Sequence, residues 1–257
     1  MRYAAGVEYV GTAYAGWQAQ AHANSVQTEV ERALSRVADA PVAIAAAGRT
    51  DAGVHALGQV IHFDSDAPRK DIAWLFGANS LLPSDIALRW VQPVPEDFHA
   101  RHSALARRYR YLIHNAAARS SLLDRRAGWC RYPLDETRMH AAARHLLGEQ
   151  DFSAFRAVEC QSRTPMRNVI AAEVSRRAQL VIVEIEANAF LHHMVRNIVG
   201  TLIEIGRGLQ PPDWTRALLE GRDRTAAGAT APADGLYLWR VRYPARFGLP
   251  EADSVLG

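Results

Sequence analysis

The feature that most constrains the fold is an order of strand-like and helix-like segments that occurs twice along the chain. The first series is a strand at 3–10, a helix at 24–37, strands at 42–47 and 59–64, a helix at 70–79 and a strand at 86–91. The second series is a strand at 107–114, a helix at 135–147, strands at 168–175 and 180–187, a helix at 190–206, a short helix at 213–220 and a strand at 236–243. Each follows the β-α-β-β-α-β order of a ferredoxin-like unit.

This repetition predicts an α+β fold with two ferredoxin/RRM-like halves joined through a mainly antiparallel sheet, and an active-site cleft between the halves. We expect an N-terminal half at 1–104, a C-terminal half at 105–245 and a tail at 246–257. Within the first half, Asn24 resembles a helix N-cap because Gln27 follows three residues later. In the strand at 59–64, Ile61 and Phe63 are predicted to face away from Val60 and His62.

Composition excludes several classes of protein. Hydrophobic residues make up 49% of the 257 residues and charged residues 22%, which is typical of a globular chain. No apolar run approaches the ~20 residues that span a bilayer, and no secretory signal is evident. Cys130 and Cys160 are the only cysteines, too few for a disulfide framework or a zinc ribbon. These features predict a cytoplasmic protein without membrane contact.

Arginine supplies nearly all of the positive charge, since Lys70 is the only lysine among 30 basic residues. Eight arginines fall within one short stretch: Arg101, Arg107, Arg108, Arg110, Arg119, Arg125, Arg126 and Arg131. The planar guanidinium suits phosphate recognition, so this arginine cluster indicates an anionic partner such as RNA. A GC-rich genome, which raises the arginine content generally, explains the same composition without any partner.

The most specific segment is Gly48-Arg49-Thr50-Asp51-Ala52-Gly53-Val54-His55-Ala56, between two predicted strands. Its glycines permit a tight turn that holds the carboxylate of Asp51 close to Arg49 and Thr50. Without further context, the same residues form a hairpin loop in which Asp51 makes an Asx-turn.

This segment resembles the active-site motif of the pseudouridine synthase family, in particular its tRNA-specific bacterial branch. Further family-like segments occur at Glu8–Gln18, Ser25–Gln27, Phe98–Arg101, Arg107–Tyr111, Gln161–Pro165, Asn188–Gly200 and Gly235–Leu238. They cover nearly the whole chain in the expected order, leaving out only its last residues.

The resemblance implies that Asp51 is the catalytic carboxylate for isomerising uridine to pseudouridine. The N1–C1′ glycosidic bond breaks, the flipped uracil turns, and a C5–C1′ bond forms. Asp51 could attack C1′ or accept a proton, and the residues do not decide between these routes. Arg196 corresponds to the basic partner that keeps Asp51 ionised, and Arg49 to the arginine that helps to extrude the base.

Tyr109 resembles the tyrosine that stacks on the target base, with Tyr111 as an alternative of the same strand parity, and Thr50 is expected to bind substrate. Each has an ordinary structural reading as well: a strand tyrosine in the core or, for Arg49 and Arg196, an arginine in solvent. The residues expected to contact RNA are Phe98, His99, Ala100, Arg101, His102, Glu159, Cys160, Gln161, Ser162 and Arg163.

The resemblance further implies a homodimer that binds tRNA and modifies uridines 38, 39 and 40 of the anticodon stem-loop. It implies no cofactor and no metal. Two other classes remain open on the residues alone. A metal-dependent hydrolase could draw ligands from His55, His62, His192, His193 and Asp51, although their spacing fits no recurrent zinc motif. A non-catalytic RNA-binding protein with two RRM-like halves would share the arginines but leave the Asp51 loop unexplained.

Overall fold

The computed structural model describes residues 1–250 and divides into two compact units. Among the described residues, unit 1 comprises residues 1–105 and 237–250, and unit 2 comprises residues 106–236. Residues 237–245, which the sequence assigned to the C-terminal half, fall within unit 1 in this division by contacts. Within residues 1–250, none of the helices has the length and apolar character to cross a membrane.

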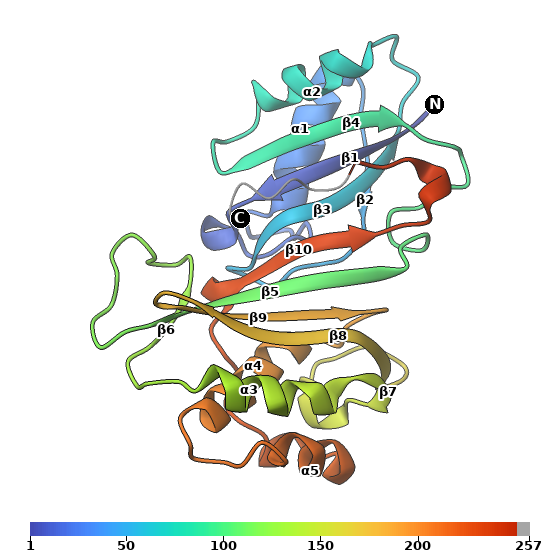
Figure 1. Ribbon diagram of the computed structural model, residues 1–257. Helices are drawn as coiled ribbons and strands as arrows, with labels where there is room; N and C mark the ends of the chain where they lie inside the picture. Colours follow the sequence, from blue (N-terminus) through green and yellow to red (C-terminus); the bar gives the residue numbers. More distant parts are fainter. Residues whose placement is uncertain (251–257) are drawn as a thin grey trace. The chain divides into compact units, whose positions relative to one another are not determined.

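In unit 1, the strand β1 (Arg2–Tyr9) lies between two neighbouring strands (Figure 1). It pairs antiparallel with β4 (Ile86–Pro93) on one side and with β3 (His55–Asp64) on the other. The far edge of β3 carries two partners: antiparallel β2 (Ile44–Ala46) and, at its other end, parallel β10 (Leu236–Arg242). The chain therefore returns to this sheet after the whole of unit 2.

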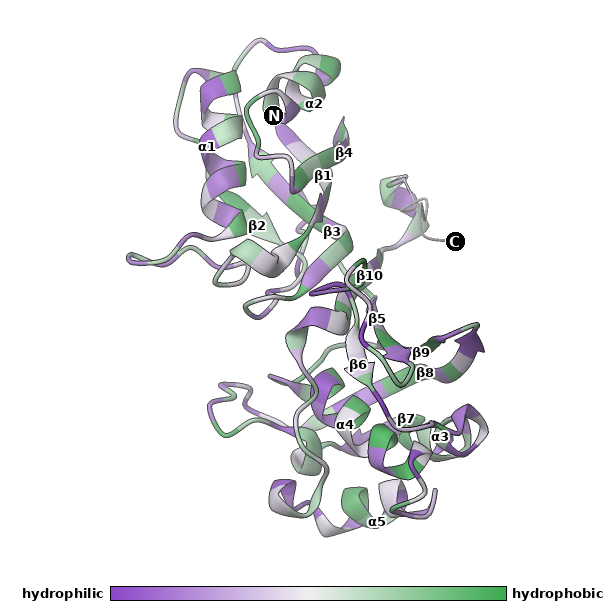
Figure 2. Cartoon of the chain, turned by 90° about the vertical axis from the view of Figure 1, so that its left-hand side faces the viewer, coloured by the Kyte–Doolittle hydropathy of each residue, from purple (hydrophilic) through white to green (hydrophobic). Residues whose placement is uncertain are grey.

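Two helices, α1 (Val26–Ala38) and α2 (Asp71–Asn79), accompany this sheet. Ser25 is the N-cap of α1, because its side chain accepts a hydrogen bond from the backbone N–H of Thr28. The prediction of Asn24 as the cap was wrong by one residue. Figure 2 shows hydrophilic and hydrophobic segments alternating along α1, as in an amphipathic helix with one buried side.

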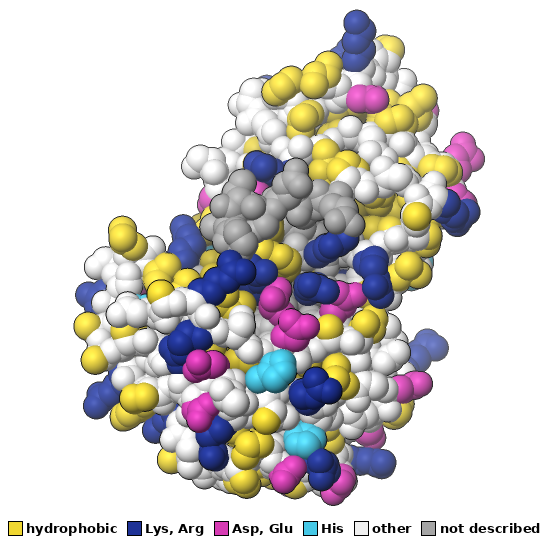
Figure 3. Space-filling view, in the orientation of Figure 1, with side chains coloured by type: hydrophobic (Ala, Val, Ile, Leu, Met, Phe, Trp, Pro, Cys, Tyr) yellow, Lys and Arg dark blue, Asp and Glu magenta, His cyan; other side chains and the backbone are white. Residues whose placement is uncertain are grey.

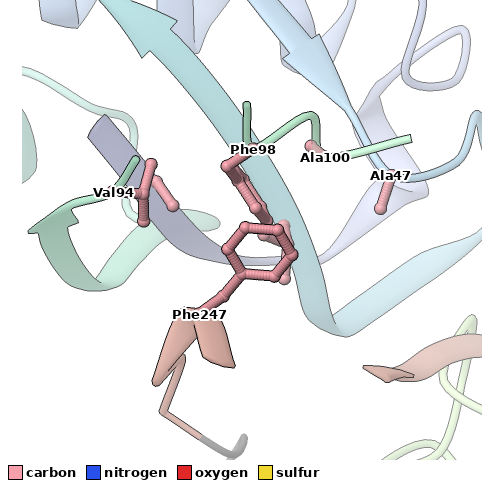
Figure 4. Close-up of a cluster of buried hydrophobic side chains, with 7 residues drawn as sticks. Ala47, Val94, Phe98, Ala100 and Phe247 are labelled. Carbon is pink, nitrogen blue, oxygen red and sulfur yellow. The ribbon is translucent and has the colours of Figure 1, made fainter. Parts of the chain in front are cut away.

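The two faces of the unit 1 sheet carry separate sets of apolar side chains. Phe63 stacks on Tyr3, and both rings contact Trp74 of α2. Val60, of opposite parity on β3, instead belongs to a buried cluster with Phe98 and Phe247 (Figure 4). The alternation predicted for this strand is therefore confirmed.

Phe247 also alters the reading of the C-terminal tail. The tail was expected to begin at residue 246, but Phe247 lies in a short helical turn (Ala245–Phe247), is buried and contacts Phe98 at 5.0 Å between ring centroids. Phe247 thus packs this segment against the core. The remainder of the expected tail, residues 251–257, lies outside the described residues.

The main strands of unit 2 follow the order β5-β9-β8-β7, and each neighbouring pair is antiparallel. These strands are β5 (Ala106–Asn115), β9 (Leu180–Ala187), β8 (Met166–Arg177) and β7 (Gly148–Asp151). The short strand β6 (Gly128–Cys130) pairs parallel to β5. β6 and β7 were not predicted, because three or four residues give too short a pattern to recognise.

Three helices complete unit 2: α3 (Glu136–Ala143), α4 (Met194–Gly206) and α5 (Trp214–Gly221). Asp135 caps α3 through the N–H of Arg138, as its position predicted. Helix α4 begins at Met194 and not at Phe190. His193 before it has a left-handed φ of 59°, which stops the helix from extending toward its N-terminus.

Candidate active site

The loop that carries Asp51 is tied to unit 1 through its backbone. The carbonyl of Gly48 accepts from Nε2 of buried Gln59 at 2.6 Å, and the carbonyl of Thr50 accepts from the N–H of Trp17 at 3.0 Å. The carbonyl of Asp51 accepts from the N–H of Val54 at 3.1 Å, which closes a turn. These bonds fix the loop on both sides of the carboxylate.

Glycines allow a neighbouring segment to approach this loop closely. A Cβ on Gly16, where φ is +98°, would lie 2.6 Å from the carbonyl oxygen of Thr50. A Cβ on Gly11 would lie 1.9 Å from the carbonyl oxygen of Val54. The segment from Glu8 to Gln18 therefore supports the Asp51 loop only because both positions lack side chains.

The three side chains expected to act on this loop have different environments. Thr50 is buried and shares a 2.7 Å hydrogen bond with the hydroxyl of Tyr9. Asp51 is half-buried, and Arg49 is exposed. On this loop, Asp51 and Arg49 are therefore at least partly accessible to solvent, whereas the buried side chain of Thr50 holds the loop in place.

His55 and Gln59 are buried polar residues whose part in this site the sequence did not reveal. Nδ1 of His55 accepts from the N–H of Gly11 at 3.1 Å, and its ring lies 4.7 Å from that of Tyr237. With Nδ1 occupied as an acceptor, His55 joins the supporting segment to the strand that follows the loop. A histidine and a glutamine on a strand otherwise rich in apolar residues were the available signals.

In unit 2, Tyr109 and Tyr111 lie on the same, inward-facing side of β5, but their surroundings differ. Tyr109 is 9% exposed and packs edge-on against Phe190 at 4.9 Å between centroids. Tyr111 is fully buried, and its hydroxyl donates to the carbonyl of Pro232 at 2.9 Å. Burial raises the pKa of Tyr111, so this hydroxyl remains a donor. Tyr111 is therefore a structural residue, which leaves Tyr109 as the base-stacking candidate.

Arg196 lies in the first turn of α4 and is half-buried. Its Nε donates to the carbonyl of Ala231 at 2.8 Å. The reading of Arg196 as an arginine on a solvated helix face therefore does not hold.

The segment at 98–102 contributes only some of the side chains expected to contact RNA. Phe98 and Ala100 are fully buried in the unit 1 core, so only their backbone atoms could reach a ligand. Arg101 and His102 are exposed, and His99 is half-buried. Nδ1 of His99 accepts from the N–H of Arg101 at 3.1 Å and shapes this turn.

The segment at 159–163 shows a similar division. Glu159, Gln161 and Arg163 are exposed, whereas Cys160 and Ser162 are partly covered. Arg156 donates to the carbonyls of both Cys160 and Ser162, at 2.7 and 2.9 Å.

Burial opposes ionisation of the Cys160 thiol. The backbone N–H groups of His192 and Ser162, with Arg156 nearby, nevertheless hold its pKa below the usual value. Cys160 thus takes part in the internal hydrogen bonding of this turn.

The arginine cluster is not uniformly available to an anion. Arg108 pairs with Glu186 at 2.7 Å and Arg110 pairs with Glu184 at 3.0 Å, across β5 and β9. Figure 3 shows Lys/Arg and Asp/Glu side chains interspersed on this face of unit 2. Arg119, Arg125 and Arg131 are exposed. Some of the eight arginines are therefore engaged in ion pairs, and the anionic partner that the cluster indicated stays a prediction for the others.

Comparison with known proteins identifies the class of enzyme to which this site corresponds. The family model described as tRNA pseudouridine synthase matches residues 5–103 and 142–244, which include the Asp51 loop, the 159–163 segment and Arg196. The chain belongs to this family.

Curated relatives within the family share a more specific name. A protein of Enterobacter sp. (strain 638) named tRNA pseudouridine synthase A is 57% identical over 250 residues, covering 97% of this chain and 93% of the relative. Proteins of the same name from Shewanella amazonensis and Hydrogenovibrio crunogenus are 57% and 56% identical, covering 98% and 96% of this chain and 96% and 94% of theirs. A solved structure of a Cbf5-Nop10-Gar1 complex aligns with a TM-score of only 0.36 at 12% identity, over 92% of this chain and 48% of that chain, too weakly to bear on the fold.

Proposed function

We propose that this enzyme isomerises uridine to pseudouridine at positions 38, 39 and 40 in the anticodon stem-loop of tRNA. The observation that carries the proposal is Asp51 on a rigidly supported loop in a chain that belongs to the tRNA pseudouridine synthase family. Relatives that are 56–57% identical over nearly their whole length bear the name tRNA pseudouridine synthase A. Carbodiimide mapping of pseudouridine on tRNA incubated with the protein tests this function directly.

We assign Asp51 to the chemistry at C1′ of the target nucleotide, as nucleophile or as proton acceptor. Arg196 is its proposed cationic partner, and its motif at Asn188–Gly200 supports this role. Arg49, exposed beside Asp51, is suited to occupy the space that the flipped base leaves. Tyr109 is proposed to stack on the uracil, and Thr50 to hold the loop at the substrate.

For RNA contacts outside the reacting nucleotide, we propose the exposed side chains of the two segments. These are His99, Arg101, His102, Glu159, Gln161 and Arg163. The backbones of Phe98, Ala100, Cys160 and Ser162 complete the set. Because the negative charge of Glu159 repels phosphate, its carboxylate would instead accept a hydrogen bond from another group of the RNA.

Three further features are proposals of organisation. The strand order β4-β1-β3, with β2 beside β3, supports a ferredoxin-like first half, and the chain order from β5 to β10 supports a second. In chain order we propose that these halves are residues 1–104 and 105–245, with residues 237–245 of the second half lying in compact unit 1. We also infer a cytoplasmic homodimer, for which light scattering of the purified protein is the direct test.

Catalysis should survive exhaustive treatment with EDTA, provided that the tRNA is folded beforehand and monovalent salt is sufficient. Substrate and product are isomers, so the reaction needs no redox centre or group donor, and a carboxylate can carry the chemistry without a Lewis acid. The measurement is pseudouridine formation before and after chelation. Loss of activity that zinc restores and magnesium does not would favour a metal enzyme instead.

Arg125, which is exposed, and Arg126, which is half-buried, should bind tRNA through phosphates. Replacing Arg125 and Arg126 by alanine should weaken binding similarly for every tRNA substrate, and flatten the log–log salt slope by about one to two units if both touch phosphate. The single-turnover rate at saturating protein should barely change.

A matched pair of substitutions, Arg216→Ala with Arg222→Ala, removes the same charge from exposed positions in and just after α5. Equal effects of the two pairs would show that net charge alone matters. Unchanged affinity and an unchanged salt slope in the Arg125/Arg126 variant would show that these two arginines do not contact the tRNA and reflect genome composition alone.

A further inference from the structure

Helix α4 is bound along one side by the segment Arg224–Pro232, which we call the strap. The N–H of Gly228 donates to Oγ1 of Thr201 at 3.2 Å, and the N–H of Ala231 donates to the carbonyl of Arg196 at 3.1 Å. The strap therefore follows α4 from its middle back to its first turn. Both elements lie within unit 2.

This approach depends on a missing side chain in α4. A Cβ on Gly200 would lie 1.7 Å from the carbonyl oxygen of Ala229, which no side chain tolerates. Gly200 is buried in the interior of a helix, where glycine costs about 1 kcal/mol relative to alanine. The close packing of the strap therefore explains why residue 200 is a glycine.

Arg224 holds the strap in shape and fixes it to the helix. Its Nη1 donates to the carbonyl of Gly228 at 3.1 Å. Its Nη2 donates to Oδ1 of Asn197 and to Oγ1 of Thr230, both at 3.0 Å. Thr230 also donates to the same oxygen of Asn197 at 2.7 Å. One guanidinium thus joins three points of the strap and helix, as its planar fork of donors allows.

The network ends on the side chain proposed to act beside the catalytic carboxylate. Asn197 is the residue after Arg196 and is itself fixed, because its Nδ2 donates to the carbonyl of Phe155 at 2.8 Å. Ala231 receives Nε of Arg196 on its carbonyl and donates its own N–H to the Arg196 carbonyl. This reciprocal pair orients the remaining N–H donors of the Arg196 guanidinium.

The far end of the strap is anchored separately. The hydroxyl of Tyr111 donates to the carbonyl of Pro232, the residue after Ala231. Ala231 therefore lies between two fixed points, Tyr111 on one side and the Arg224 network on the other.

We propose that Arg224 is a positioning residue for pseudouridine formation: through the strap and the Ala231 carbonyl, it sets the orientation of the Arg196 guanidinium. This inference rests on the proposed role of Arg196 as the partner of Asp51. Arg224 itself touches neither substrate nor reacting atoms in this scheme. Displacing a catalytic group by about 1 Å can slow a reaction as much as 100-fold, so loss of the network should act on the chemical step.

A double-mutant cycle tests the proposal in the full-length protein. Arg224→Met should slow the single-turnover reaction about 10- to 100-fold with tRNA affinity within about twofold. In an Arg196→Met background, the same substitution should have no further effect on the rate, because its target is gone. Equal slowing in both backgrounds, or none in the wild-type background, would overturn the proposal.

Additional variants separate positioning from loss of folding. Thr230→Val removes the hydroxyl of an exposed residue from the network and should slow the chemical step by a smaller factor than Arg224→Met does. The Thr230→Val variant replaces Arg224→Met in the test if Arg224→Met unfolds below the assay temperature. Arg216→Met, an exposed arginine on α5, should match wild type. The ¹⁵Nε–H resonance of Arg196, assigned by its absence in Arg196→Met, should shift in Arg224→Met and stay in place in Arg216→Met. An unshifted resonance contradicts the proposal, whereas full activity of Arg196→Met would contradict the underlying role of Arg196 instead.

Discussion

Asp51→Asn should reduce pseudouridine formation by about four orders of magnitude or more, while tRNA affinity stays within a few-fold of wild type. The amide has nearly the shape of the carboxylate but can neither attack C1′ nor accept a proton at neutral pH. The loop should keep its form, because the hydrogen bonds accepted by the carbonyls of Gly48, Thr50 and Asp51 remain in place. Single-turnover assays and equilibrium binding measure the two quantities separately.

Asp66→Asn is the matched control, since it makes the same chemical change at a fully exposed carboxylate of unit 1. It should leave both rate and affinity unchanged. Appreciable turnover by Asp51→Asn would remove this residue from the mechanism. A joint loss of binding and of the thermal unfolding transition would instead mark the loop as purely structural.

The sequence predicted most helices and strands because their patterns are local. The apolar spacing of α1 and the alternation in β3 depend on neighbouring residues, so each was evident without tertiary information. The start of α4 was missed because a single left-handed residue, His193, interrupts a continuous apolar pattern. Nor could periodicity show that β10 packs with β3, since that pairing joins residues far apart in the chain.

Motifs were enough to select the candidate site, but they did not reveal what makes its loop rigid. The motif around Asp51 predicted a catalytic carboxylate, whereas the supports at Gly11, Gly16 and Gln59 became evident only from close contacts. Phe98 was expected to contact RNA because it lies in a family-like segment, yet its side chain fills the core. Related proteins can thus share a motif residue because it packs in the core or because it binds a ligand. The burial of its side chain distinguishes the two.

Arg196→Met should slow the chemical step by about 100-fold or more at saturating protein, with tRNA affinity within a few-fold of wild type. Methionine keeps much of the side-chain volume but removes every donor, including the Nε bond to the Ala231 carbonyl. A charge that stabilises the reacting groups contributes most in the transition state, so its loss should lower the rate far more than the binding. Arg196→Lys restores the positive charge but not the planar fork of guanidinium donors, and should recover only part of the rate.

Arg207→Met, which removes an exposed guanidinium at the other end of α4, should behave as wild type in the same single-turnover assay. A rate for Arg196→Met within about twofold of wild type would contradict the role of Arg196, and equal losses in Arg196→Met and Arg207→Met would reduce that role to general electrostatics.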